Sequence, residues 1–100
     1  MNGVYNEAIK RWGAQAQTIK LVEECGELIQ AVAKWQNART DLNRQAMALN
    51  CIEEIADVEI MIEQFKKILQ PDCGKSIKDM VYDRRQEKLI RLRERLDREG

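Results

Sequence analysis

Four acidic residues occur as two pairs with the same spacing, Glu24 with Glu27 and Glu54 with Asp57. Residues three apart lie on the same side of an α-helix, so each pair would present two carboxylates in one direction. Mg²⁺ takes oxygen ligands in proteins, as does Mn²⁺, and a divalent cation would offset the repulsion between neighbouring carboxylates. The two pairs therefore predict a divalent cation site wherever the fold brings them together.

The apolar residues around each pair indicate which way the carboxylates point. Glu54 falls within the predicted buried stripe of its helix, and Asp57 lies at the edge of that stripe on the same side. Glu24 falls at the border of the apolar face of the other helix, and Glu27 follows one turn later. The residues of that predicted face are Leu21, Val22, Cys25, Leu28, Ile29, Val32 and Trp35. A buried carboxylate without a partner costs several kcal/mol or takes up a proton, so a folded protein usually supplies a cation. The residues of the predicted stripe around Glu54 are Met47, Cys51, Ile55, Val58, Met61, Ile62, Phe65 and Leu69.

The first pair also has a simpler interpretation. Glu24 and Glu27 could lie on a solvated helix edge and form ion pairs with Lys20 or Lys34 in the same helix. Such pairs are common on helix surfaces. One pair of acids is therefore weak evidence for a metal site, and the second pair inside an apolar stripe favours it.

The elements that must position these residues are all helices. Apolar residues recur at three- and four-residue intervals, while alternation typical of strands is absent. We expect a short helix ending at Gly13, a second over about 15–36, a third that reaches residue 70, and a fourth ending near residue 98. Thr40 or Asp41 would cap the third helix, and Ser76 with Asp79 resembles a capping box for the fourth. At 100 residues the chain is expected to form one domain, 1–100.

Composition excludes several kinds of chemistry. Lys and Arg number 17, as do Asp and Glu, so no net positive field would recruit nucleic acid or an anionic membrane. Acids also interrupt the arginine-rich stretch 84–98, which argues against a nucleic-acid binder. The chain has no histidine, which excludes Ser-His and Cys-His nucleophiles. Three separated cysteines and the lack of a long apolar run predict a protein of the cytoplasm without a membrane span.

Other residues are candidates for contacts with a substrate. Arg85 and Lys88 fall inside the apolar stripe of the last helix, where they could meet phosphates or pair with neighbouring acids. Trp12 and Trp35 could stack on a nucleobase, although tryptophan at helical spacing is more often part of a core. Trp35 could also belong to an interface between subunits.

The acidic residues and their neighbours resemble those of a known superfamily. The segments Leu21-Val22-Glu23-Glu24-Cys25-Gly26-Glu27-Leu28 and Glu53-Glu54-Ile55-Ala56-Asp57-Val58 are similar to the ExxE and ExxD signature of the MazG-like all-α nucleoside triphosphate pyrophosphohydrolases. Twenty-six residues separate Glu27 from Glu54. The resemblance extends over roughly residues 12–92. Relatives in this superfamily include dimeric dUTPases, dCTP pyrophosphatases and phosphoribosyl-ATP pyrophosphohydrolases.

This resemblance implies a fold, a cofactor and an activity. The fold would be a four-helix MazG-like bundle that assembles as a homodimer or a dimer of dimers. Glu24, Glu27, Glu54 and Asp57 would bind Mg²⁺, with Mn²⁺ as an alternative, and an activated water would cleave a nucleoside triphosphate to monophosphate and pyrophosphate. Relatives often carry Asn and Lys two residues apart on the last core helix, whereas this chain has Gln86 and Lys88.

The sequence therefore predicts a Mg²⁺-dependent nucleotide pyrophosphohydrolase. Glu27 and Glu54 are the expected catalytic residues, Glu27 as the ligand that faces the water, and Lys88 with Arg85 would contact phosphate. The alternative is a non-catalytic, homo-oligomeric interaction module in which the inward acids pair with cations of the last helix. The base, the sugar and the physiological pathway are not indicated by the sequence.

Overall fold

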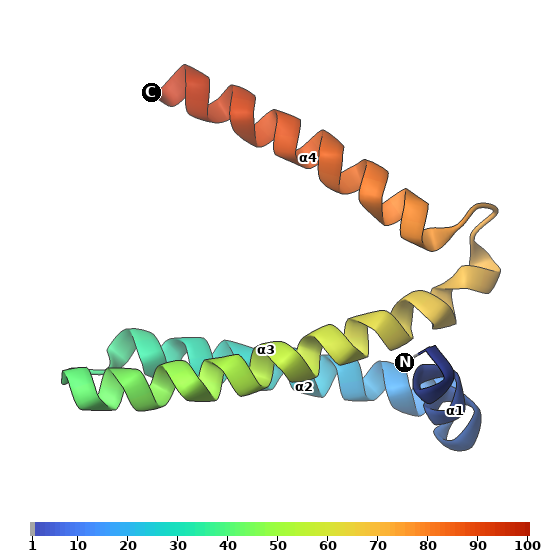
Figure 1. Ribbon diagram of the computed structural model, residues 1–100, viewed down its shortest axis with the longest axis horizontal. Coiled ribbons are helices and arrows are strands. Elements are labelled where there is room, and N and C mark those ends of the chain that lie inside the picture. The colour runs from blue at the N-terminus through green and yellow to red at the C-terminus, as the bar shows by residue number, and fades with distance from the viewer. Residues whose placement is uncertain (1) are drawn as a thin grey trace. The chain divides into compact units, whose positions relative to one another are not determined.

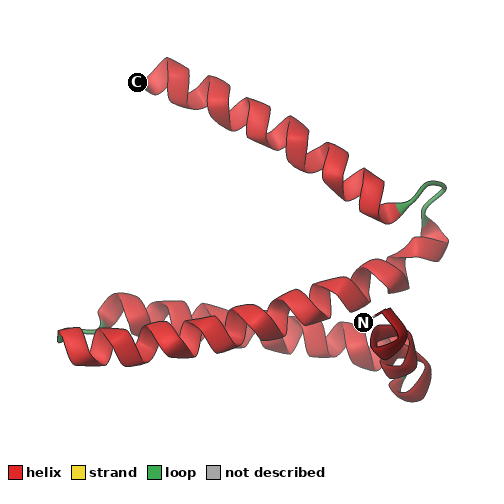
Figure 2. Cartoon of the chain, in the orientation of Figure 1, coloured by secondary structure: helices red, strands yellow, loops and turns green. Residues whose placement is uncertain are grey.

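The computed structural model of the protein describes residues 2–100, and over that range it contains helices and no strand (Figure 1, Figure 2). The predicted all-α class is thus confirmed for these residues. Each predicted helix ends within one residue of the observed end. The elements are α1 (Asn2–Trp12), α2 (Ala14–Asn37), α3 (Asp41–Leu69), the 3₁₀ helix η1 (Gln70–Asp72) and α4 (Ile77–Glu99).

Local signals in the sequence explain where the helices begin and end. Gly13 separates α1 from α2 with a φ of 91°, a conformation that glycine adopts without the steric cost of a Cβ. The Thr40 hydroxyl accepts a hydrogen bond of 3.1 Å from the backbone N–H of Asn43, so Thr40 caps α3. Ser76 caps α4 in the same way, accepting from the N–H of Asp79 at 3.5 Å.

The chain divides into two compact units, 1–68 and 69–100. The second unit consists of the last residue of α3, η1, a turn and α4. Gln70 holds the turn together, since its amide donates to the carbonyl of Lys75 at 2.8 Å and accepts from the N–H of Ile77 at 2.9 Å. The bond from Ile77 also satisfies one of the free N–H groups at the beginning of α4.

In the first unit, α2 and α3 form an antiparallel hairpin, and α1 contacts α2 (Figure 1). Half of the buried residues described in the hairpin are polar and half are apolar. Gln17, Glu24 and Ala31 of α2 follow one another at intervals of seven residues, which is about two helical turns. They therefore lie on one face of α2. The corresponding buried residues of α3 are Val58, Met61 and Gln64.

The predicted apolar faces are only partly buried, which corrects one expectation. Val22 and Ile29 of α2 are 68% and 69% exposed, and Ile55 and Ile62 of α3 are 45% and 41% exposed. The face of α2 that meets α3 contains Glu24 and is rotated away from Val22 and Ile29. The hairpin thus buries a narrow, mixed stripe and leaves much apolar surface in contact with solvent.

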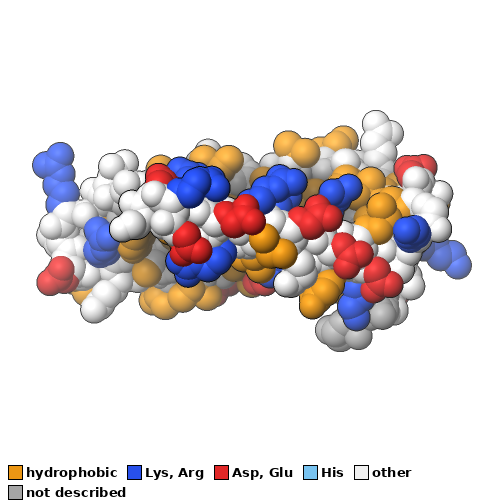
Figure 3. Space-filling model, turned by 90° about the horizontal axis from the view of Figure 1, so that it is seen from above, with side chains coloured by type: hydrophobic (Ala, Val, Ile, Leu, Met, Phe, Trp, Pro, Cys, Tyr) orange, Lys and Arg blue, Asp and Glu red, His pale blue; other side chains and the backbone are white. Residues whose placement is uncertain are grey.

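Helix α4 contains no buried residue. Its apolar side chains Leu89, Leu92 and Leu96 are about half exposed, at 52%, 48% and 50%. Figure 3 shows acidic and basic side chains intermingled with apolar ones on the face that it displays. Among residues 2–100, no helix is both long and apolar enough to cross a membrane.

Candidate metal centre

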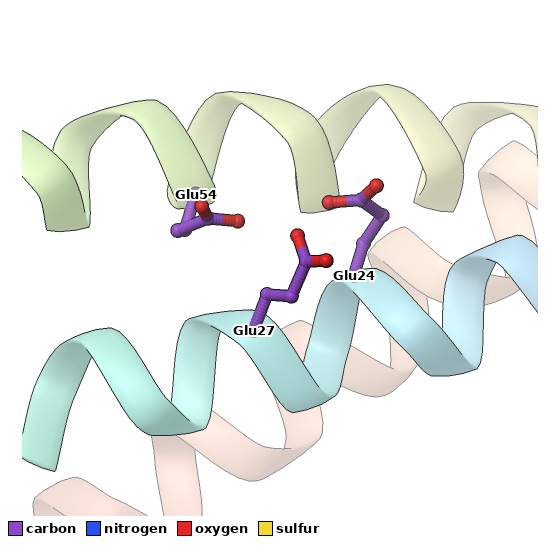
Figure 4. A group of neighbouring side chains, drawn as sticks. All are labelled: Glu24, Glu27 and Glu54. Atoms are coloured by element: carbon purple, nitrogen blue, oxygen red, sulfur yellow. The ribbon is translucent and has the colours of Figure 1, made fainter.

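Three of the four predicted carboxylates meet between α2 and α3. One carboxylate oxygen from each of Glu24, Glu27 and Glu54 lies within 4.8 Å of the others (Figure 4). Helix α2 provides two of these side chains and α3 provides the third, and all three extend into the space between the two helices (Figure 4). We call this group the acidic layer. The predicted convergence of acids from two neighbouring helices is found in these three residues.

The three carboxylates differ in their exposure to solvent. Glu24 is buried, Glu54 is half-buried and Glu27 is exposed. Oε2 of Glu24 and Oε2 of Glu54 are buried and have no hydrogen-bond partner. A buried acceptor without a partner loses its hydration and gains nothing in return. The acidic layer therefore has a closed inner end with two unsatisfied oxygens and an open outer end at Glu27.

The charges of the acidic layer act on one another. The negative charge of Glu24, and after it that of Glu54, raises the pKa of the Glu27 carboxyl above its usual value. A proton on Glu27 relieves this repulsion, and a bound cation would relieve it as well. The acidic layer thus favours positive charge at its open end.

One side chain already supplies positive charge to the acidic layer. Lys20, one turn before Glu24 on α2, places its Nζ 3.3 Å from Oε1 of Glu24. The hydrogen bond to Glu24, together with the charge of Glu24, raises the pKa of Lys20. The predicted pairing with Lys20 is found for Glu24, which is nevertheless buried, and not for Glu27. Lys34 forms none of the ion pairs found in the described part of the chain.

The donor set fits a hard divalent cation. All three donors are carboxylates, and Mg²⁺ and Mn²⁺ take oxygen ligands, whereas a structural zinc site would be expected to contain sulfur or nitrogen donors. Mg²⁺ normally retains several waters and binds through a few carboxylates together with phosphate oxygens. The exposed end at Glu27 leaves room for such further ligands. The two inner oxygens have no hydrogen-bond partner and are available to contact a cation.

Asp57 lies outside this group of three. Its side chain is exposed, one helical turn after Glu54 on α3. Its role as a fourth ligand stays a prediction.

The predicted phosphate ligands belong to the second unit. Arg85 and Lys88 are exposed and form none of the ion pairs found among residues 2–100. They border a hollow of about 370 Å³ on one side of α4. Its remaining lining residues are Cys73, Ile77, Met80, Val81 and Arg84.

The two tryptophans have different surroundings. The side chain of Trp12, at the end of α1, is 61% exposed and borders a hollow of about 140 Å³. Trp35 is half-buried near the end of α2, and the guanidinium of Arg44 lies 4.2 Å from the centre of its ring. One face of Trp35 is therefore already covered by a cation. Stacking of either tryptophan on a nucleobase stays a prediction.

Sequence reasoning missed two buried amides on either side of the hairpin interface. Gln17 and Gln64 are 8% and 6% exposed. The amide of Gln64 donates weakly to Sδ of Met61 at 3.7 Å, and its Oε1 has no partner. The seven-residue spacing of Gln17 from Glu24 was the available signal, since it places both residues on one face of α2.

Comparisons of the chain with protein-family models, with curated proteins and with solved structures found no match. The geometry of the acidic layer and the spacing of its residues therefore carry the functional argument.

Proposed function

We propose that this protein is a Mg²⁺-dependent nucleoside triphosphate pyrophosphohydrolase that releases a nucleoside monophosphate and pyrophosphate. The observation that carries the proposal is the acidic layer, in which Glu24 and Glu54 each keep a buried oxygen without a partner. The resemblance to the MazG-like signature supports the reaction, because it covers the same residues. Mn²⁺ is the alternative cation, and Asp57 is the proposed fourth ligand.

The residues of the acidic layer have different tasks in this proposal. Glu24, which is buried and held by Lys20, fixes the inner side of the site. Glu54 adds the carboxylate from α3. Glu27 is the exposed member of the layer, so it is placed to face the attacking water. When bound, Mg²⁺ would supply charge neutralisation at the attacked phosphoryl group and a water of lowered pKa.

The phosphate tail of the substrate also needs cations from the protein. Lys88 and Arg85 are the proposed contacts, because their charges are free of ion pairs among the described residues. Trp12 and Trp35 are the proposed contacts to the base. The free state of Cys25, Cys51 and Cys73 suits a reducing compartment, and we place the enzyme in the cytoplasm.

We further propose that the active form is a homodimer or a dimer of dimers. Ala31, Val58 and Met61 are the buried apolar residues found in the described part of the chain, which is a small core for helices of this length. Val22 and Ile29 lie in an apolar surface that a second copy would cover. Light scattering coupled to size exclusion measures the assembly, and a strictly monomeric mass would contradict it.

Pyrophosphate release tests the activity. Wild-type protein with Mg²⁺ is incubated with a panel of canonical and modified nucleoside triphosphates, and pyrophosphate and monophosphate are quantified. We expect Glu54→Gln to lower turnover at least about a hundredfold, because it removes a charged ligand from the layer while keeping the shape of the side chain.

Glu59→Gln is the matched control, since Glu59 is an exposed glutamate of the same helix outside the acidic layer. It should leave turnover unchanged. Turnover by Glu54→Gln at the wild-type rate, with both variants equally helical by circular dichroism, would refute the proposed mechanism.

The exposed apolar surfaces also favour a second candidate, a non-catalytic interaction module that associates with itself. In that case the inward acids would only pair with cations, as Glu24 does with Lys20. The protein would then release no pyrophosphate from any nucleotide and would bind no divalent cation, while still forming the oligomer.

A further inference from the structure

Lys20 stands at the edge of the acidic layer, and it is far more exposed than the acid with which it pairs. Its side chain is 52% exposed, whereas the Glu24 side chain that it contacts at 3.3 Å is 9% exposed. A second acid, Glu23, lies 3.9 Å from the same Nζ and is itself exposed. The Lys20 ammonium is thus paired with a buried carboxylate, while about half of the Lys20 side chain is exposed.

The two oxygens of Glu24 are used unequally. Oε1 faces Lys20, whereas Oε2 is buried without a partner. Among residues 2–100, Lys20 is the one cation within ion-pair distance of the acidic layer. One ammonium therefore faces a group of three carboxylates, and it leaves the inner oxygens of Glu24 and Glu54 available.

We propose that Lys20 is the resident counter-ion of the acidic layer and that it changes partner when a divalent cation binds, moving from Glu24 to a phosphate oxygen of the ligand. The inference rests on the proposed function and assigns a phosphate contact that lies on the same helix as two metal ligands. Once a divalent charge neutralises Glu24, the attraction that holds Lys20 falls. Lysine has a flexible four-carbon stem and a compact charge, so the ammonium can turn toward an anion at the open end of the site.

This change of partner predicts that removal of Lys20 has opposite effects on two affinities, that for the cation alone and that for polyphosphate. Without Lys20 a divalent cation meets no competing positive charge, so the cation alone binds more tightly. A polyphosphate that binds together with the cation loses one charge-assisted hydrogen bond, so it binds more weakly. If Lys20 merely stabilised the helix, its removal would change neither affinity. If Lys20 only oriented Glu24, its removal would lower the affinity for the cation.

Titration calorimetry on the full chain measures both affinities. Mn²⁺ is titrated into metal-free protein, and inorganic pyrophosphate is then titrated into protein saturated with Mg²⁺. For Lys20→Met we expect Mn²⁺ to bind roughly threefold to tenfold more tightly. We expect pyrophosphate to bind about tenfold more weakly. Lys20→Arg keeps the charge and should stay close to wild type for Mn²⁺.

Two further variants make the test specific. Lys20→Gln repeats the loss of charge with a polar side chain, and circular dichroism verifies that both neutral variants are helical. Lys34→Met is the matched control, because Lys34 is an exposed lysine of α2 outside every ion pair found among the described residues. It should leave both affinities unchanged.

Unchanged or weaker Mn²⁺ binding in Lys20→Met, or unchanged binding of pyrophosphate, would refute the proposed change of partner by Lys20. Neither result would refute the metal site itself. Absence of Mn²⁺ binding to the wild-type protein is a different failure, because it removes the proposed function together with this inference.

Discussion

Helix α4 and the acidic layer both carry many charges, but they use them in different ways. The ion pairs of α4 are short and lie in solvent, with every partner side chain more than half exposed. The pair between Lys20 and Glu24 is longer, at 3.3 Å, and one of its members is buried. The α4 pairs are Arg84 with Glu87 and Arg93 with Asp97, each at 2.8 Å, and Arg95 with Glu99 at 2.9 Å.

The two regions thus differ in the burial of their charges more than in the length of their ion pairs. Water screens exposed pairs, so each contributes between zero and about 1 kcal/mol. In the acidic layer three carboxylates face one another, and two of their oxygens are cut off from water without a partner. That arrangement costs stability unless a proton or a cation offsets the repulsion.

The largest expected effect is stabilisation of the acidic layer by metal. At a free Mg²⁺ concentration about a hundred times the dissociation constant, stability should rise by about 2.7 kcal/mol. For a chain of this size the melting temperature would rise by roughly 10–20 °C. Differential scanning calorimetry with and without EDTA measures the shift. Glu54→Gln should lose most of it, and an unchanged shift in that variant would show that the cation binds elsewhere.

The second expected effect is a dependence of stability on pH. The pKa of Glu27 is raised in the folded protein, so the folded state holds this proton more strongly than the unfolded state. In EDTA, stability should therefore fall as pH rises from the ordinary carboxyl value of 4.5 through the raised pKa. Glu27→Gln should lack this fall and be more stable than wild type at neutral pH.

Urea denaturation between pH 4 and pH 8 measures the difference between Glu27→Gln and wild type, which isolates this carboxyl from the other titrating groups. Glu59→Gln is again the matched control. Parallel pH profiles for wild type and Glu27→Gln would mean that the charges of Glu24 and Glu54 do not reach Glu27.

The smallest expected effect lies in α4. Arg93→Gln removes the ion pair with Asp97, whose two partners are 69% and 65% exposed. Unfolding free energy should change by less than about 0.5 kcal/mol, and Mg²⁺ affinity should not change. A loss of more than about 2 kcal/mol in a urea titration would place this pair in an interface and would weaken the contrast between the two regions.

The helices and much of the acidic layer could be predicted from the sequence because both depend on local spacing. Gly13, Thr40 and Ser76 act on the backbone within a few residues, and the observed helix ends agree with them. The three-residue interval between Glu24 and Glu27 fixed their shared side of α2 in the same way.

The relative burial of the acids could not be predicted, because it depends on the rotation of α2 against α3. A helical wheel ranks faces by hydrophobicity and so favours Val22 and Ile29 as buried. The packed face instead contains Gln17 and Glu24, and it places Glu24 inside and Glu27 outside. Conflicts of this kind between pattern and packing are expected where a functional site is located.

Calorimetric titration of Mg²⁺ into metal-free wild-type protein and into Glu24→Gln examines the proposed cation site itself. The account predicts saturable binding to the wild type and at least tenfold weaker binding to the variant, since Glu24 supplies the buried, unpartnered oxygen. Equal binding by both proteins, or no binding by the wild type, would contradict the claim that the carboxylates of α2 and α3 form a divalent cation site.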